Sequence, residues 1–446
     1  MLIRFVAENF LSFKDETEFN MLTGDVRRHP NHVYSFPKVD ILKSAVIYGA
    51  NGAGKSNLIL AINFLSELVT AGSLDSFNDD VSFKLSEDER PSSLEVEFLI
   101  EEVGYSYGMV FIGSTIQEEW LYLLNYGKKD DDLIFERKID KSGNTKINMA
   151  PKYLKSQKDR LLIQVYEEDL LEPSVPFISL VKDKKFKEIN RAYKWIEKGL
   201  IVILPGMQYA GLTYSFIDDE DFKSFTNGLI SKFDTGIKEL DIQTLDFDQY
   251  FGEDNKNEKD RILKLIKSGE MERVGDSKNA VAMLEDGKPV IKKVVSYHMT
   301  PSGKKVKFEL FDESDGTLRL IDFIPVLYIL EKFPITVMID EIDQSIHPTL
   351  LKEFVAQIQD NPNKVGQLIF TTHESNLLDL DLFRQDEIWF AEKNKEGATH
   401  LYPLSEYNVR PDLDIRKGYL SGRFGAIPFL GDLRKLRLEE YAQEQE

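Results

Sequence analysis

The eight residues from Gly49 to Ser56 have the types and spacing that bind a phosphate group. They lie between an apolar run at 45–48 and a segment of helical spacing that begins at residue 57, so they read as a loop between a strand and a helix. In such a loop glycines let backbone N–H groups turn toward the β-phosphate, a lysine reaches the β- and γ-oxygens, and a hydroxyl reaches Mg²⁺. A glycine turn that binds nothing is the alternative, but it gives Lys55 no role. The predicted nucleotide contacts are Gly49, Asn51, Gly52, Ala53, Gly54, Lys55, Ser56 and Asn57.

Two carboxylates follow a second apolar run, at 335–339. At the end of a strand, Asp340 is suited to hold Mg²⁺, and Glu341 is suited to take a proton from the water that attacks the γ-phosphate. Taken alone, an Asp-Glu pair after a strand is equally typical of a helix N-cap. Together with the phosphate loop, the pair predicts an ATPase in which Ser56 and Asp340 hold the metal and Glu341 is catalytic.

A histidine and a glycine turn complete the set of candidate residues. His373 ends a third apolar run, where the ligand crevice of an open α/β sheet is expected, and its imidazole can hydrogen-bond the γ-phosphate or orient the water. A lone histidine is more often structural, but its position after this strand favours a catalytic role. Ser314 and Gly316 supply a hydroxyl and a helix N-terminus, although a plain turn would look the same.

Composition limits the class of protein. The chain has 446 residues, of which 42% are hydrophobic, enough for two domains or for one large α/β domain with an insertion. It has no cysteine, which excludes disulfides, thiolate zinc sites and cysteine nucleophiles. We find no apolar run as long as a membrane span and no secretory signal, and therefore expect a soluble cytoplasmic protein. A formal charge of -20 argues against indiscriminate nucleic-acid binding.

The elements that position these residues follow from periodicity. Residues 3–13 and 17–22 predict a hairpin, and alternation predicts an antiparallel meander and a second hairpin between 94 and 147. Residues 27–32 could contact a base or a phosphate, but a plain loop is favoured. We expect an α/β nucleotide-binding head with a mixed sheet, an antiparallel β subdomain and a helical insertion. The predicted parts are residues 1–150, a helical insertion at 151–280 with helices at 186–196, 219–233 and 258–266, and residues 281–446, which end in a polar helix at 436–445.

Motifs near both ends of the chain carry a specific resemblance. They are Glu8-Asn9-Phe10-Leu11-Ser12-Phe13, the phosphate loop, Glu313-Ser314-Asp315-Gly316-Thr317, Ile339-Asp340-Glu341-Ile342-Asp343 with Ser345-Ile346-His347-Pro348, and the segments 367–373, 386–390 and 416–429. With these motifs the chain resembles the ABC-type ATPases of the RecF, SMC and OLD group, whose head domain is divided by an insertion. Within that group it is most similar to stand-alone ATPases of the RloA, AbiL and AriA kind, which are associated with abortive infection and phage defence.

The resemblance assigns further roles. Ser314 and Gly316 would form the signature loop, which contacts the γ-phosphate held by a second subunit, and Asp343 would lie in the D-loop of that dimer. Gln117 is the nearest match to the glutamine-loop residue near the metal, with Glu118 and Glu119 as alternatives. Asp315 and Thr317 replace a glycine and a Gln or Glu of the usual signature. A carboxylate beside a triphosphate is unfavourable, which predicts weak engagement across the dimer and slow hydrolysis.

The leading hypothesis is an ATPase, dependent on ATP and Mg²⁺, that forms dimers or larger assemblies and acts as sensor or regulator of an anti-phage system. No nuclease motif accompanies the ATPase motifs, so a separate effector is expected, such as a TOPRIM-type nuclease, together with a phage trigger. The alternatives are a RecF-like DNA-repair or chromosome-maintenance ATPase that grips duplex DNA, and a nucleotide-locked scaffold. The glycines at 418, 422 and 425 could dock a partner, reach the nucleotide or simply cover the surface.

Overall fold

The computed structural model describes residues 1–427 except 89, 128, 183–185, 208–210, 234, 253–254, 268, 270, 275–278, 408 and 411–412. The chain divides into two compact units. Unit 1 comprises Met1–Leu200 and Ile369–Glu446, and unit 2 comprises Ile201–Leu368. None of the helices within the described ranges has the length and apolar character needed to cross a membrane.

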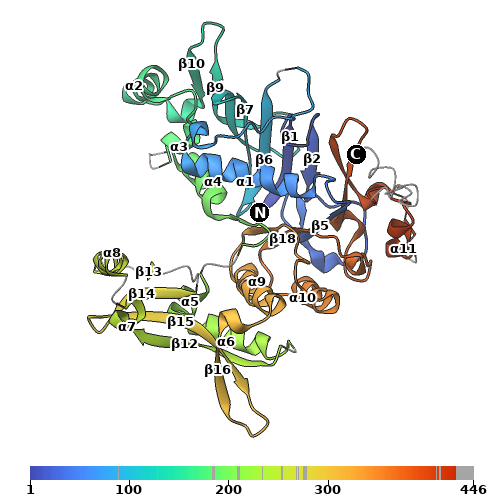
Figure 1. Cartoon of the computed structure of the whole chain (residues 1–446). Helices are drawn as coiled ribbons and strands as arrows, with labels where there is room; N and C mark the ends of the chain where they lie inside the picture. The colour runs from blue at the N-terminus through green and yellow to red at the C-terminus, as the bar shows by residue number, and fades with distance from the viewer. Residues whose placement is uncertain are drawn as a thin grey trace, which may run out of the picture. The chain divides into compact units, whose positions relative to one another are not determined.

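Unit 1 contains an antiparallel sheet with the strand order β10-β9-β8-β7-β6-β1-β2 (Figure 1). Buried and partly exposed residues alternate along β6, as expected for a sheet with one face in the core. The predicted hairpin and meander are therefore confirmed. The strands are β1 (Leu2–Glu8), β2 (Thr17–Asn20), β6 (Ser92–Ile100), β7 (Val103–Ile112), β8 (Thr115–Leu123), β9 (Asp132–Ile139) and β10 (Thr145–Met149).

A second sheet of unit 1 carries the phosphate loop. All six residues of β5 (Ser44–Gly49) are buried, which suits a central strand with both faces covered. β5 pairs in parallel with β19 (Ile388–Lys393), which pairs antiparallel with β20 (Thr399–Pro403). On its other side lies the end of β18 (Gln367–Thr371), where the Thr372 N–H donates to Ile47 O at 3.1 Å. A short hairpin joins β3 (Val33–Ser35) to β4 (Asp40–Leu42).

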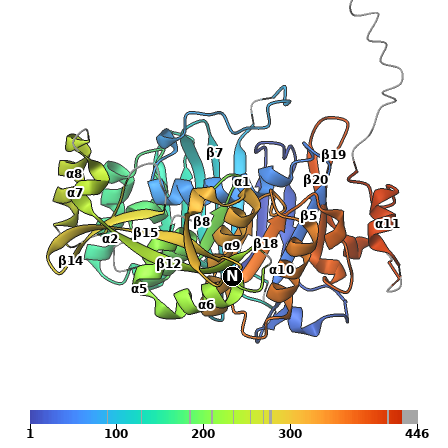
Figure 2. The same cartoon turned by 60° about the horizontal axis from the view of Figure 1, so that its bottom comes forward.

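The helices of unit 1 cover these sheets. In α1 (Lys55–Ala71) the Phe64 ring lies 5.1 Å from Phe10 and 5.9 Å from Phe111, so the helix that follows the phosphate loop packs on the antiparallel sheet. Figures 1 and 2 both place α11 (Ile415–Leu420) beside the sheet that contains β5. The remaining helices are α2 (Gln157–Val165), α3 (Phe177–Leu180) and α4 (Lys187–Lys198).

Unit 2 contains an antiparallel sheet of order β12-β15-β14-β13, in which β15 also pairs with β16. Helices α7 and α8 contribute Phe247, Phe251, Ile262 and Ile266 to one buried cluster with Ile291 of β15. The strands are β12 (Ile237–Asp246), β13 (Glu272–Arg273), β14 (Ala280–Glu285), β15 (Lys288–Met299) and β16 (Lys305–Glu309), and the helices are α5 (Leu212–Asp218), α6 (Glu220–Ile230), α7 (Phe247–Phe251) and α8 (Lys256–Ile266).

The rest of unit 2 holds the second group of candidate residues. The buried strand β17 (Thr336–Ile339) ends directly before Asp340, whose N–H donates to Ile203 O of β11 (Leu200–Ile203) at 2.9 Å. Helix α9 (Asp315–Lys332) precedes β17, and α10 (Pro348–Asp360) follows it. Strands at both predicted carboxylate and histidine positions are thereby confirmed, as is the α/β fold class.

The segment predicted to be a helical insertion differs from that expectation. Helices α4, α6 and α8 match the predicted ones, but β12 is a strand of ten residues that was missed. Its apolar residues lie at 237, 240, 242 and 245, which fits neither clean alternation nor a helical stripe, because the strand is half exposed. The division of the chain also falls at other places than 150 and 280. The predicted helix at 436–445 lies outside the described residues.

The placement of residues 151–200 has a physical cause. Trp195 of α4 stacks on Phe98 of β6 at 4.1 Å, and the Ser66 hydroxyl of α1 donates to Ile196 O at 2.9 Å. These contacts attach α4 to the antiparallel sheet and to α1. The helices at the start of the predicted insertion therefore belong to unit 1.

Candidate functional site

The predicted strand, glycine loop and helix are present at residues 44–71. Gly52 and Gly54 have φ values of 75° and 102°, which other residues rarely adopt. Gly49 is needed for space, since a Cβ there would lie 2.5 Å from the backbone oxygen of Ala391 in β19. The loop therefore has the backbone shape that its glycines predicted.

Lys55 and His373 lie together at the mouth of this loop. The Lys55 side chain is buried, and its Nζ donates to Gly49 O at 2.9 Å and to Ala50 O at 3.2 Å. Lys55 Nζ is also 3.5 Å from His373 Nδ1, a long contact in which only the ammonium can donate. Of the predicted site residues, the structure thus brings the histidine to the phosphate loop.

A small turn sets the position of His373. Its neighbour Thr372 is fully buried, and the Thr372 hydroxyl accepts from the Glu374 N–H at 3.0 Å. The His373 side chain itself is exposed. An exposed imidazole on a fixed turn can meet a substrate phosphate without first leaving a packed core.

In unit 2 the two carboxylates occupy different environments. Asp340 is 2% exposed, whereas Glu341 is half-buried. The helix after them begins at Pro348 with His347 as its N-cap, so the N-cap alternative for the Asp-Glu pair is excluded. Glu341 has φ of 52°, a left-handed conformation that costs a non-glycine residue on the order of 1–3 kcal/mol. Such strain is typical of functional residues.

The predicted signature residues start α9. The Ser314 hydroxyl accepts from the Thr317 N–H at 3.2 Å and lies 2.9 Å from the Thr317 hydroxyl, so Ser314 caps its own helix. A Cβ on Gly316 would lie 2.7 Å from the backbone oxygen of Ser345. The signature turn therefore touches the predicted D-loop, in which Asp343 is half-buried.

Three further contacts fix this region, and the sequence did not reveal any of them. The Glu313 carboxylate accepts from the Ser296 hydroxyl at 2.5 Å and lies 2.7 Å from His298 Nε2, which ties the signature turn to β15. The Gly206 N–H donates to Gln344 Oε1 at 3.2 Å. None of these contacts belongs to a short motif, so no local signal could have indicated them.

Gln117 lies at an irregularity in β8. Ile116 pairs with Phe111 and Glu118 pairs with Val110, which leaves Gln117 in a bulge of the antiparallel sheet. A bulge redirects a side chain and is common near functional sites. The role of Gln117 stays a prediction.

Glu119, two residues after Gln117 in β8, has a structural role. Its buried carboxylate accepts from the Phe177 N–H at 2.6 Å and the Ile178 N–H at 3.1 Å, and it lies 3.8 Å from Arg137. Burial raises the pKa of Tyr107, whose protonated hydroxyl donates to Glu119 at 3.1 Å. Glu119 therefore holds the start of α3.

For magnesium, the predicted protein ligands are oxygen donors. Ser56 offers a hydroxyl in the first turn of α1, and Asp340 offers a carboxylate at the end of β17. Hydroxyl and carboxylate oxygens, completed by water and substrate phosphates, are what Mg²⁺ prefers. The chemistry of the predicted donors fits the metal.

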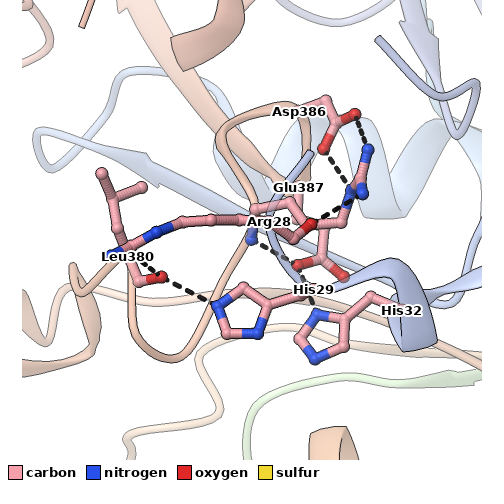
Figure 3. Close-up of polar contacts among 7 residues, drawn as sticks. Arg28, His29, His32, Leu380, Asp386 and Glu387 are labelled. Carbon is pink, nitrogen blue, oxygen red and sulfur yellow. Dashed lines mark hydrogen bonds and ion pairs between the residues drawn. The ribbon is translucent and has the colours of Figure 1, made fainter. Parts of the chain in front are cut away.

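Residues 27–29 form a loop that leads into a 3₁₀ turn at Pro30–His32, and hydrogen bonds hold this segment in place (Figure 3). Arg28 Nη1 donates to Leu380 O at 2.7 Å, and His29 Nε2 lies 2.9 Å from the same oxygen. His32 Nδ1 lies 2.9 Å from Glu387 Oε2, and both side chains are buried. These polar groups are thus used to join two parts of unit 1.

The C-terminal glycine turn lies beside the phosphate loop. A cleft of about 420 Å³ is lined by residues 50–53, by 391–393 at the end of β19, and by Gly422, Gly425, Ala426 and Ile427. The Tyr402 hydroxyl lies 2.9 Å from Phe424 O and 3.0 Å from Glu392 Oε2. Burial and the hydrogen bond to Glu392 raise the pKa of Tyr402. The turn is therefore fixed next to the loop.

Comparison with known proteins gives one family. A family model described as "AAA domain, putative AbiEii toxin, Type IV TA system" matches residues 44–379, which include every motif from the phosphate loop to His373. Among curated proteins no match is found.

Three solved structures of SMC head domains are similar over most of the chain. One is bound to the C-winged helix domain of ScpA, with 13% identity, coverage of 90% of this chain and 97% of that chain, and a TM-score of 0.44. The head from Thermotoga maritima has 14% identity, coverage of 90% and 98%, and a TM-score of 0.40. The head with an extended coiled coil, bound to the C-terminal domain of ScpA derived from Pyrococcus furiosus, has 13% identity, coverage of 95% and 98%, and a TM-score of 0.43.

Proposed function

Because this chain belongs to the family described as an AAA domain, putative AbiEii toxin of a type IV TA system, we propose that it binds ATP with Mg²⁺ and hydrolyses it. The observation that carries the proposal is the phosphate loop itself, with the Lys55 ammonium inside its mouth and His373 3.5 Å away. A buried lysine ammonium in a glycine loop at a helix N-terminus is suited to a polyanion and to few other ligands.

We assign the remaining roles as follows. Ser56 and Asp340 would hold Mg²⁺, which neutralises charge on the β- and γ-phosphates. Glu341 takes a proton from the attacking water, and His373 hydrogen-bonds the γ-phosphate. The strained backbone of Glu341 supports its role, since it fixes a half-buried carboxylate that a relaxed turn would present differently.

We further propose that two chains assemble on ATP, with Ser314 and Gly316 of one chain meeting the nucleotide of the other and Asp343 near the dimer axis. In this proposal the chain is a cytoplasmic sensor or regulator in abortive infection, acting through a separate effector. The family description, which names a toxin of the AbiEii type, supports a role in such a system.

The first test compares phosphate release and solution mass for the wild type and Glu341→Gln, with and without ATP. Loss of the base should reduce turnover at least a hundredfold, because proton transfer by a positioned side chain contributes about 10²–10⁴ to the rate. It should also trap an ATP-bound dimer or larger assembly.

The matched control is Glu353→Gln, the same change at an exposed residue of α10 in the same unit. If Glu341→Gln hydrolyses ATP as fast as this control, Glu341 is not the base. If the wild type assembles on ATP but shows no turnover above Glu341→Gln, the scaffold alternative is correct.

A further inference from the structure

A pair of buried hydroxyl groups lies behind the phosphate loop, and no motif marks it. Ser12 comes from the turn between β1 and β2, Thr399 is the first residue of β20, and they are 6% and 1% exposed. Thr399 Oγ1 lies 2.8 Å from Ser12 Oγ and 2.8 Å from the backbone oxygen of Ala53 in the loop. Asn57 Nδ2 donates to Ser12 Oγ at 2.7 Å.

The direction of these hydrogen bonds follows from counting protons. A carbonyl oxygen only accepts, so the Thr399 hydroxyl must donate to Ala53 O. Thr399 has no second hydroxyl proton, so the Ser12 hydroxyl must donate to Thr399 Oγ1. Asn57 then supplies the hydrogen bond that Ser12 accepts. The four groups form one directed chain, which ends on the loop and in which each hydroxyl both donates and accepts.

This chain determines where the next N–H of the loop points. In a planar trans peptide the C=O and the following N–H point in opposite directions. Because Ala53 O is held toward Thr399, the Gly54 N–H must point away from Thr399. A phosphate cradle presents its N–H groups to the anion, so a phosphate on the side opposite Thr399 would meet the Gly54 N–H.

Position 54 requires a glycine for lack of space as well as for its backbone conformation. A Cβ on Gly54 would lie 2.1 Å from Thr399 Oγ1 and 2.8 Å from Ser12 Oγ. The Thr399 N–H also donates to Ser12 O at 2.8 Å, so backbone and side chain hold the same two segments together. The loop, the N-terminal turn and β20 therefore pack as one rigid piece.

We propose that Thr399 and Ser12 are positioning residues that direct the Gly54 N–H toward the β-phosphate. They act through Ala53 and do not touch the nucleotide. This inference rests on the proposed ATP binding and deepens it, because it assigns the loop's preorganisation to residues at the two ends of the chain.

The test is the affinity for ADP and ATP, measured by titration calorimetry. Thr399→Val keeps the side-chain shape and removes the hydroxyl, which should weaken both nucleotides about tenfold, the effect of losing one hydrogen bond and leaving its acceptor unpaired. Since the lost contact serves ground state and transition state equally, KM should rise while kcat stays the same. Thr399→Ser should restore the affinity.

The direction of the hydrogen bonds also predicts that loss of the Ser12 hydroxyl weakens nucleotide binding less than loss of the Thr399 hydroxyl. Ser12→Ala leaves the hydrogen bond from Thr399 to Ala53 O intact, so it should weaken ADP only about threefold. The control is Thr226→Val, because the buried hydroxyl of Thr226 has no hydrogen-bond partner within the described part of the chain.

Equal ADP affinity for Thr399→Val and the wild type would overturn the inference, and so would a Thr399→Ser variant as weak as Thr399→Val. If Thr399→Val does not fold, Ser12→Ala decides, with unchanged affinity as the refuting result. A wild type that binds neither ADP nor ATP would instead refute the proposed function, and the inference with it.

Discussion

The two turns that precede α1 and α9 are built in opposite ways, although both are candidates for contact with a triphosphate. The turn before α1 ends in Gly54, which has no side chain to cap the helix, and it is held from behind by Thr399. The turn before α9 is capped by its own Ser314, whose hydroxyl accepts from the Thr317 N–H. The first turn is oriented by a hydroxyl of another strand, and the second is capped by a hydroxyl of its own.

This difference indicates which step of the proposed cycle, nucleotide binding or assembly, a single chain is built to carry out first. No side chain caps the helix at the loop before α1, whereas at the turn before α9 the Ser314 hydroxyl already accepts from the Thr317 N–H and has one proton of its own to offer a γ-phosphate. We therefore expect nucleotide binding to precede assembly and to be insensitive to changes at the signature turn.

The largest expected effect comes from Lys55→Ala. Removal of the buried ammonium should weaken ATP binding on the order of a hundredfold or more, because a charge-assisted contact to phosphate is lost in a water-poor site. Titration calorimetry measures this, and plaque counts on cells that carry the chain with its neighbouring genes measure the loss of phage defence.

Lys198→Ala, at an exposed lysine of α4, serves as its control. ATP affinity that is equal in the two variants would show that the loop does not hold the phosphates.

Gly316→Ala should distinguish the role of the signature turn from that of the phosphate loop. Its Cβ would lie 2.7 Å from the backbone oxygen of Ser345, so the signature turn and the D-loop must move apart. We expect ATP-dependent assembly to weaken about tenfold, a shift of roughly 1.4 kcal/mol, while ATP affinity of the single chain stays the same. Light scattering coupled to size exclusion gives the first quantity.

Gly228→Ala is the matched control, because a Cβ there meets nothing within 4 Å and its φ is ordinary. Equal loss of nucleotide affinity and of assembly in Gly316→Ala would mean that the two turns are not independent.

The smallest effect is expected from Asp315→Asn. The Asp315 side chain is exposed at the start of α9, where a negative charge stabilises the helix but repels an incoming γ-phosphate. Its removal should strengthen ATP-dependent assembly by about threefold at low salt, and the gain should shrink at high salt because exposed charges are screened. A gain that is unchanged by salt would contradict this electrostatic origin.

The sequence predicted the local elements around the candidate residues better than the distant contacts that support them. The phosphate loop, the strand ends at Asp340 and His373, and the helix start at Ser314 are local patterns, so they could be read directly. Thr399 could not, since a hydroxyl that acts 346 residues away from Ala53 has no signature in its own neighbourhood. Likewise, nothing local indicated the left-handed backbone of Glu341.

The larger errors in predicting the fold concern β12 and the helices at 157–198. β12 exposes much of its length, so its apolar spacing resembled neither a strand nor a helix. The helices at 157–198 were grouped with later ones because periodicity gives the element but not the surface on which it packs, here β6 and α1.

The hydroxyl chain behind the phosphate loop also bears on how the protein matures during translation. The loop is made early, but β19, which borders Gly49, and Thr399, which orients Ala53, are synthesised more than 330 residues later. A nascent chain that stops short of β20 therefore lacks the groups that shape the loop. Tight nucleotide binding then arises only once β20 has been made, so chains truncated before it cannot compete for ATP or enter assemblies.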